Sequence, residues 1–204
     1  MNNPENKIQN ENKEASQSKG QSKSITLYVF SLGNPGAEYQ HTRHNAGRII
    51  CDEMLSKKIF ENISHYAKAS RDREINNTSN INLTIKYFEP TTFMNNTGKY
   101  IRDKMRNSKE GSIVVIIYDD IDLELAEVKL SHGRSSGGHN GVQSVIDVLG
   151  TKDFYRVRIG IGGKPIKEML LQDYVLSKLK QSEINLLKES VEKVAEKIVK
   201  IIKK

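Results

Sequence analysis

Residues 25–45 read ITLYVFSLGNPGAEYQHTRHN, and this stretch decides the fold. Its first part, Ile25 to Leu32, is a continuous β-rich apolar run, which is typical of a strand buried on both faces. The loop that follows opens with Asn-Pro-Gly, a strong turn signal because Pro fixes φ and Gly permits a positive φ. An apolar-periodic run then predicts a helix over Ala46 to Phe60. Loops of this kind hold ligands in open α/β sheets, and this one carries amides, a phenol, an Arg and two His.

Strands and helices alternate along the rest of the chain. The strongest strand signal is Ser112 to Tyr118, SIVVIIY, which we expect at the centre of a parallel or mixed sheet. Tyr66 to Ala69 is ambiguous and could be a strand. The alternation predicts an α/β fold in a single domain. Further strands are predicted at 81–88, 127–131 and 155–162, and further helices at 91–107, 142–149 and 182–204.

The predicted helix at 91–107 has an unusual start. Thr91 is a candidate N-cap, but Asn95, Asn96 and Gly98 follow within the first turns. These residue types are poor in a helix interior. A reason other than helix propensity must therefore explain them.

The first 24 residues differ in composition from the rest. They consist almost entirely of Asn, Lys, Glu, Gln and Ser, so they bury too little apolar surface to offset the entropy of ordering. We predict a disordered polar tail over 1–24 and one domain over 25–204. The tail has no apolar core of a secretory signal, and its lack of Arg argues against a transit peptide.

Composition bounds the partners and the compartment. The net charge of +7 fits a polyanionic partner such as nucleic acid, and it fits equally a soluble protein from a lysine-rich proteome. The single cysteine, Cys51, lies in an apolar-periodic run, so it is expected in the core and fits a reducing compartment. No apolar run approaches the roughly 20 residues of a membrane span, so no membrane partner is expected.

Basic residues suggest a nucleic-acid surface as one of two interpretations. Lysines of the predicted C-terminal helix could be an ordinary solvated face or a surface that tracks phosphates. Arg156 and Arg158 alternate on one strand and are expected to face the same side, while Lys129 and Arg134 lie near a glycine-rich loop. The chain has no Trp, which disfavours base-by-base stacking on single strands.

Polar clusters follow the ends of several predicted strands or open predicted helices. Such ends can meet at one edge of an α/β sheet. A His with a carboxylate partner is a general base of fixed orientation, and Asn side chains suit the holding of a carbonyl, a water or an oxyanion. Together they predict hydrolysis of an acyl or similar bond by activated water, without a covalent intermediate. The convergent residues are Asn34, His44, Asn95, Asp119, His139 and Asn140.

Other chemistries have weaker support. There is no Gly-x-Ser-x-Gly elbow, and the glycine-rich loop 133–141 lacks the Gly-Lys-Ser/Thr of a Walker loop. His41 with His44, or Asp119 with Asp120 and Asp122, could ligate a metal. The aspartates lack the rest of an EF-hand, and such residues more often cap or turn the chain. A catalytic metal is therefore the minor alternative.

The motifs resemble those of one family. From about Ile25 to the C-terminus the chain is similar to the bacterial-type peptidyl-tRNA hydrolases, and the motifs occur in the order typical of that family. The matching segments are LGNPGAEYQHTRHNAG at 32–47, PTTFMNNTG at 90–98, YDDIDL at 118–123, GGHNGVQSVI at 137–146 and YRVRIGIGGKP at 155–165.

The resemblance implies a monomeric, cytoplasmic esterase with a twisted mixed sheet flanked by helices. Such an enzyme cleaves the ester between a peptide and the tRNA 3′ ribose, and so returns tRNA to translation. The expected partner is peptidyl-tRNA, contacted at its acceptor stem and 3′ end. No metal and no organic cofactor is implied.

The resemblance also implies roles for individual residues. His44 activates the attacking water and Asp119 orients His44. Asn34 and Asn95 hold the peptide and the 3′-terminal part of the substrate, and Asn140 positions water or tRNA. The other expected contacts are Tyr39, Met94 and His139 along the cleft, and Arg158 at the tRNA 5′ phosphate.

The chain departs from the family pattern at several positions. Glu124-Leu125-Ala126 stands where Pro-x-Gly is usual, and Ser131 stands where a second basic residue is usual. Arg134 replaces a common glycine and is a candidate substitute for that base, as is Lys129. Ser31 and Glu89 replace a usual glycine and a usual lysine. The altered positions keep two alternatives open: a non-catalytic RNA-binding module on the same fold, and generic salt-driven nucleic-acid binding.

Overall fold

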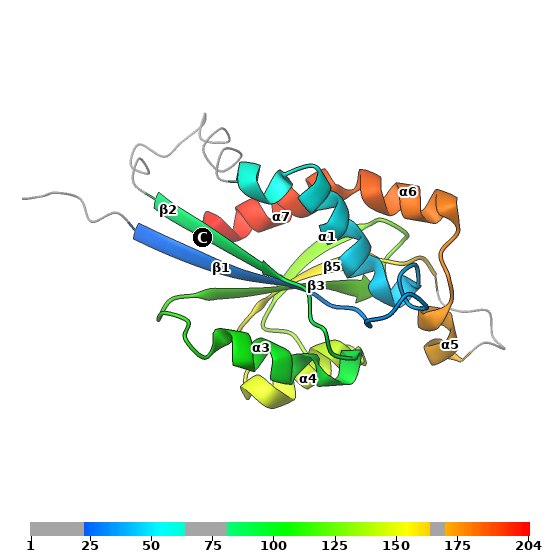
Figure 1. Cartoon of the computed structure of the whole chain (residues 1–204), viewed down its shortest axis with the longest axis horizontal. Helices are drawn as coiled ribbons and strands as arrows, with labels where there is room; N and C mark the ends of the chain where they lie inside the picture. Colours follow the sequence, from blue (N-terminus) through cyan, green and yellow to red (C-terminus); the bar gives the residue numbers. More distant parts are fainter. Residues whose placement is uncertain (1–22, 64–80, 164–169) are drawn as a thin grey trace, which may run out of the picture.

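A computed structural model describes residues 23–63, 81–163 and 170–204. In these residues five strands form one sheet, and only β4 runs antiparallel to its neighbour (Figure 1). The mostly parallel, mixed sheet predicted from the sequence is therefore confirmed. Most of the predicted tail, and the ambiguous segment 66–69, lie outside the described residues. The strand order is β2 (Ile81–Phe88), β1 (Lys23–Ser31), β3 (Ile113–Asp120), β5 (Tyr155–Gly160) and β4 (Val128–His132).

Helices cover both faces of the sheet, as Figure 1 shows. One face carries α1 (Ala46–Ser56), α6 (Gln181–Glu189) and α7 (Val191–Ile202); the other carries α3 (Thr97–Met105) and α4 (Asn140–Leu149). The short α5 (Leu171–Leu176) lies beyond the strand ends. None of the helices in the described ranges is long and apolar enough to cross a membrane.

The core has two layers, one on each side of the sheet. Along β1, Leu27 and Val29 belong to the cluster on the α1 side, whereas Tyr28 and Phe30 belong to the cluster on the α3 and α4 side. Both sets are buried. Because helices cover both faces, the central strands read as continuous apolar runs rather than as alternating ones.

The order of the strands creates a crevice between β1 and β3. The connection after β1 leads to β2 on one side of β1, whereas the connection after β3 leads to β4 on the other side, so the two connections leave in opposite directions. In open α/β sheets ligands bind at such a switch point, outside the carboxyl ends of the strands. Asn34, which follows β1, lies there together with Asp119 and Asp120 at the end of β3.

The predicted C-terminal helix is two helices. α6 ends at Glu189 and α7 begins at Val191, with a turn at Ser190. The Ser190 hydroxyl donates to the Leu187 carbonyl at 2.7 Å, and the Ser190 N–H donates to the same oxygen at 3.0 Å. A side-chain hydroxyl that competes for a helical carbonyl favours such a break. The apolar spacing continues across it, so the sequence pattern could not reveal the turn.

The helix predicted at 91–107 begins later, and Thr91 does not cap it. A 3-10 helix, η3 (Met94–Asn96), precedes α3, so two of the poor helix formers lie outside it. Gly98 is required by packing: a Cβ there would lie 2.0 Å from the Ser144 carbonyl oxygen of α4. The Gly98 N–H also donates to Ser144 Oγ at 3.0 Å. α3 and α4 thus cross with their backbones in contact.

Ala126 adopts a backbone conformation that favours glycine. Its φ is 61°, and it lies between β3 and β4, where the family pattern has Gly. The Ala126 N–H donates to the Gly160 carbonyl at 3.0 Å, which joins this loop to the end of β5. A left-handed conformation costs an L-residue roughly 1–2 kcal/mol. This departure therefore reduces the stability of the loop.

Ala126→Gly should raise the free energy of unfolding by up to about 1 kcal/mol. The gain is the relief of the left-handed conformation minus the greater unfolded-state entropy of glycine. Urea denaturation measures it. Ala195→Gly, the same change within α7, is the control and should destabilise the protein. A lower stability for Ala126→Gly would contradict the assignment of strain.

Candidate active site

A cleft of about 810 Å³ opens at the carboxyl ends of the parallel strands. Its walls come from the ends of β1 and β3, from η3, from the glycine-rich loop 133–138 and from α5. The structure therefore brings together segments that are far apart in the sequence. The predicted site residues that line the cleft are Asn34, His44, Met94, Asn95, Asp119, His139, Asn140 and Arg158.

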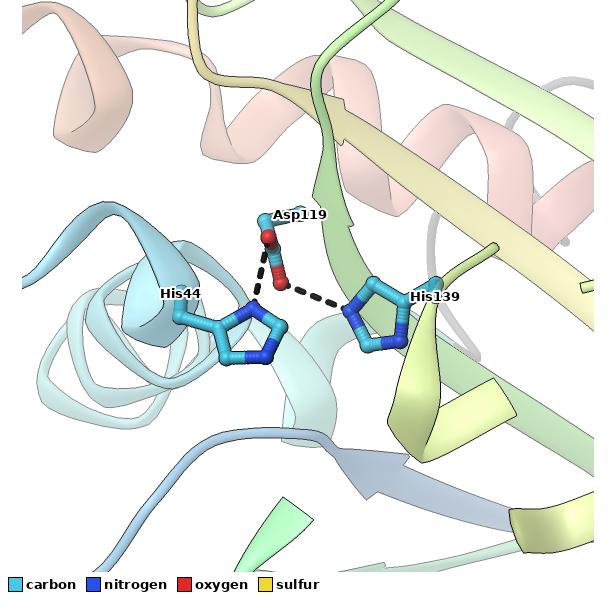
Figure 2. Close-up of side chains that lie close together, drawn as sticks. All are labelled: His44, Asp119 and His139. Atoms are coloured by element: carbon cyan, nitrogen blue, oxygen red, sulfur yellow. Dashed lines mark hydrogen bonds and ion pairs between the residues drawn. The ribbon is translucent and has the colours of Figure 1, made fainter. Parts of the chain in front are cut away.

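The Asp119 carboxylate lies between two imidazoles (Figure 2). His44 Nδ1 is 2.8 Å from Asp119 Oδ2, and His139 Nε2 is 2.9 Å from Asp119 Oδ1. Asp119 is buried near the end of β3. Burial alone would raise the pKa of this carboxyl, but the two imidazoles and their hydrogen bonds hold the pKa well below its usual range. Asp119 is thus a carboxylate with both oxygens satisfied.

The tautomer of His139 follows from its two partners. His139 is the N-cap of α4, and its Nδ1 accepts a hydrogen bond from the Val142 N–H at 3.2 Å. An acceptor nitrogen carries no proton, so the proton of the neutral ring is on Nε2, which faces Asp119. His139 is therefore a neutral donor to the carboxylate as well as a helix cap.

His44 has the opposite arrangement. Its Nδ1 faces Asp119 and must donate there, which leaves Nε2 as the nitrogen with an available lone pair. The residue belongs to η2 (Arg43–Asn45), directly before α1. Burial alone would lower the pKa of His44, but the charge of Asp119 and the hydrogen bond to it together raise the pKa above 6.5. The geometry is that of a general base with a carboxylate partner.

Asn34 is held from several directions. Its backbone N–H donates to Asn45 Oδ1 at 2.8 Å, and Asn45 Nδ2 donates back to the Asn34 carbonyl at 2.9 Å. The side-chain Oδ1 of Asn34 accepts from the Met94 N–H at 2.9 Å. The Nδ2 amide is therefore the group of Asn34 that remains to donate toward a substrate.

The remaining predicted contacts lie around the mouth of the cleft. Asn95 and Asn140 are exposed, whereas Met94 is buried in the wall. Tyr39 lies outside the lining, and its ring meets the edge of Phe93 with centroids 6.0 Å apart. Phe93 itself lines the cleft and is 52% exposed. Tyr39 thus supports an exposed aromatic side chain at the rim.

Arg158 pairs with a carboxylate beside the cleft. Its Nε is 2.6 Å from Asp120 Oδ2. Burial alone would lower the pKa of Arg158, but the hydrogen bond and charge of Asp120 raise it. Arg134 and Ser131 also line this part of the cleft, whereas Lys129 does not and instead pairs with Glu127 at 2.8 Å.

The structure excludes Arg156 from the phosphate-tracking surface that was one of the two interpretations of the basic residues. Its side chain is fully buried, with the guanidinium 3.9 Å above the centre of the Phe154 ring. It donates to the carbonyls of Phe154 at 3.0 Å and Arg134 at 2.6 Å. Arg156 therefore fixes the start of the glycine-rich loop, while Arg158, two residues later, reaches the cleft.

A metal would compete with the hydrogen bonds of this site. His44, Asp119 and His139 each offer a ligand atom, and these atoms lie within 4.8 Å of one another. Both Asp119 oxygens already accept an imidazole N–H, and the remaining nitrogen of His139 accepts from Val142. A cation between the three side chains would have to replace these bonds. The arrangement suits a hydrogen-bonded triad better than a metal centre.

Comparison with known proteins agrees with the motifs. The sequence model of the family described as peptidyl-tRNA hydrolase matches residues 28–204. The peptidyl-tRNA hydrolase of Thermodesulfovibrio yellowstonii is 38% identical over 182 residues, covering 86% of this chain and 92% of that protein. The enzyme of Thermoanaerobacter sp. strain X514 is 41% identical over 178 residues, covering 86% and 93%. The chain belongs to the peptidyl-tRNA hydrolase family.

Solved structures of peptidyl-tRNA hydrolases share the fold. One, crystallised with n-propanol, aligns with a TM-score of 0.57 at 26% identity, covering 86% of this chain and 88% of that one. Another, from Acinetobacter baumannii, aligns with a TM-score of 0.53 at 25% identity, covering 91% and 90%. The predicted family, fold and enzyme class of this chain are confirmed.

Sequence reasoning missed several residues of the site. Asn45 was part of a quoted motif, but nothing in the sequence showed that its side chain holds the backbone of Asn34. α5 was not predicted, although Leu171 and Val175 form one wall of the cleft. Tyr118 was predicted as the end of a strand, and its ring lies 4.8 Å from that of His139. Its position next to Asp119 was the one signal in the sequence that Tyr118 would lie at the site.

Asp119→Asn should lower the pKa of His44. The substitution removes the charge that raises this pKa, while burial of the imidazole, which lowers it, remains. NMR titration of the His44 ring protons measures the change. Asp120→Asn is the control, since Asp120 bonds Arg158 and the Asp122 N–H rather than His44. An unchanged His44 titration in Asp119→Asn would show that the contact does not set the pKa.

Proposed function

We propose that His44 is the general base with which this protein hydrolyses the ester between a peptide and the 3′ ribose of tRNA. The observation that carries the mechanism is the buried pair of His44 Nδ1 and Asp119 Oδ2, at 2.8 Å. It leaves His44 Nε2 as the basic nitrogen of a residue that lines the cleft. The protein is proposed to act as a cytoplasmic monomer, as the family resemblance implies.

The reaction follows from that arrangement. His44 Nε2 takes a proton from water as the water oxygen bonds to the ester carbonyl carbon. Asp119 stabilises the imidazolium that forms, because its carboxylate already accepts the Nδ1 proton. The tetrahedral intermediate then breaks its bond to the ribose oxygen. That oxygen receives the proton from His44, so the products are a peptide acid and tRNA with a free 3′ hydroxyl.

Amide groups supply donors for the peptide and ester groups of the substrate. The Asn34 Oδ1 atom is used by the Met94 N–H, so the Asn34 Nδ2 group is oriented as a donor. Asn95 lies in η3, one residue after Met94, and lines the same cleft. Preorganised neutral donors of this type hold the ester and the peptide in position for attack by water.

The other end of the cleft suits tRNA phosphates. Arg158 and Arg134 both line it, and their charges fit a contact to the acceptor stem near the 3′ end. Ser131 stands where the family usually has a basic residue. Arg134, rather than Lys129, is proposed to replace that residue, because Lys129 lies outside the lining of the cleft and pairs with Glu127. Such contacts contribute salt-dependent affinity without reading sequence.

His44→Ala should lower kcat for cleavage of an N-blocked aminoacyl-tRNA by about 10²–10⁴-fold, the range for loss of a general base. A single-turnover assay with the enzyme in excess measures the chemical step. His41→Ala is the matched control, because His41 is exposed in the same loop, and it should keep near-wild-type activity. Near-full cleavage by His44→Ala would exclude this mechanism. Binding of tRNA with no cleavage by the wild-type protein would instead indicate a non-catalytic RNA-binding module.

The rate should rise with pH through an apparent pKa above 6.5. His44 acts only when neutral, and Asp119 favours its protonated form, so a higher pH is needed to obtain the base. A profile of kcat/KM between about pH 5 and 9 measures this pKa. A rate that is already maximal below pH 6 would contradict a raised pKa for the base.

A further inference from the structure

Arg48 links two loops behind the active site. It lies in the first turn of α1, and its side chain is buried. The guanidinium Nη2 donates to the Gly33 carbonyl at 2.7 Å and also to the Pro90 carbonyl. Its Nη1 pairs with Glu89 Oε1 at 2.7 Å. Gly33 follows β1, whereas Glu89 and Pro90 follow β2, so one side chain joins the ends of adjacent strands.

Both loops carry residues of the proposed substrate site. Gly33 precedes Asn34, and Pro90 begins the segment that leads to Met94. The last paired residues of β1 and β2 are Phe30 and Phe88, so the sheet ladder ends before either loop reaches the cleft. Beyond the ladder, the hydrogen bond from the Met94 N–H to Asn34 Oδ1 joins the loops at the cleft, and Arg48 joins them from behind.

Asn34 lies between two hollows. Asn34 lines the active-site cleft and also a second hollow of about 350 Å³, to which Arg48, Asp52 and Glu89 contribute. The hydrogen bonds that fix its position run to Asn45 and from the Met94 N–H. Arg48 also restricts Gly33 by contact, because a Cβ on Gly33 would lie 2.5 Å from Arg48 Cδ.

The cation of Arg48 is placed where electrostatics disfavour it. The first turn of a helix carries partial positive charge, and α1 has no acidic residue in that turn. Burial lowers the pKa of Arg48, and the charge of Glu89 opposes that effect. Glu89 and the two carbonyls therefore supply the interactions that keep the guanidinium against the loops.

We propose that Arg48 is a positioning residue, held by Glu89, that sets the Asn34–Met94 contact for binding the peptide end of the substrate. The catalytic pair is separate from this arrangement, because His44 and Asp119 form no hydrogen bond with Arg48 or Glu89. The inference rests on the proposed function in taking Asn34 as a substrate contact. Its effect should therefore fall on substrate affinity rather than on the base.

Arg48→Met tests the proposal, because it keeps an apolar side chain over Gly33 and removes the donors. KM for N-blocked aminoacyl-tRNA should rise about tenfold, the loss expected from roughly one to two net hydrogen bonds. The apparent pKa of the rate profile should not move. Glu89→Gln should change KM in the same direction by less. Lys57→Met is the matched control, since the exposed Lys57 lies at the C-terminal end of α1, where it pairs with Glu53, and should leave KM unchanged.

Amide hydrogen exchange at Met94 gives a readout that does not need activity. In Arg48→Met the Met94 N–H should exchange at least about tenfold faster, whereas Lys57→Met should leave it unchanged. If Arg48→Met proves unstable, Arg48→Lys, which keeps the charge without the planar fork, should show intermediate effects. Unchanged exchange at Met94, or a lower melting temperature with unchanged KM, would overturn the proposal. Lack of hydrolysis by the wild-type protein would overturn the proposed function alone, since the exchange result still decides whether Arg48 positions the loop.

Discussion

The site depends on one buried carboxylate. Asp119 lies near the end of the central strand β3, where an unpaired charge would be strongly unfavourable. Two imidazole N–H groups satisfy its two oxygens, and each bond fixes the tautomer of the ring that makes it. The two hydrogen bonds therefore do more than offset the cost of burying the Asp119 carboxylate. They determine that His44 presents a basic nitrogen and that His139 does not.

The same interaction connects the chemistry to the packing of the helices. His139 gives one nitrogen to Asp119 and the other to the first turn of α4, so the imidazole joins the strand to the helix. α4 in turn packs against α3 at Gly98, where the backbones touch. α3 is preceded by η3, which carries Met94 and Asn95. The walls of the cleft are thus held by contacts that begin at the carboxylate and end at the substrate-facing amides.

Much of this could be predicted from the sequence, because the fold follows from apolar patterns and the site from the ends of strands. Asn34, His44 and Asp119 were expected at one edge of the sheet, and the structure places them there. The break at Ser190 was not predictable from the pattern, since the apolar spacing continues through it. Alternation along β5 indicated that Arg156 and Arg158 share a face, but it could not show that Arg156 would be buried.

Residues that position others are the hardest to recognise in a sequence. Asn45 ends a stretch of obvious chemistry and Arg48 follows it, yet their partners are backbone groups of Asn34, Gly33 and Pro90. A backbone carbonyl has no signature in the sequence, and the bond to Pro90 crosses 42 residues of chain. Asp119 and His44 could be paired from the sequence because a carboxylate accepts hydrogen bonds and an imidazole N–H donates them. The polar links behind Asn34 become visible only when the loops after β1 and β2 are seen side by side.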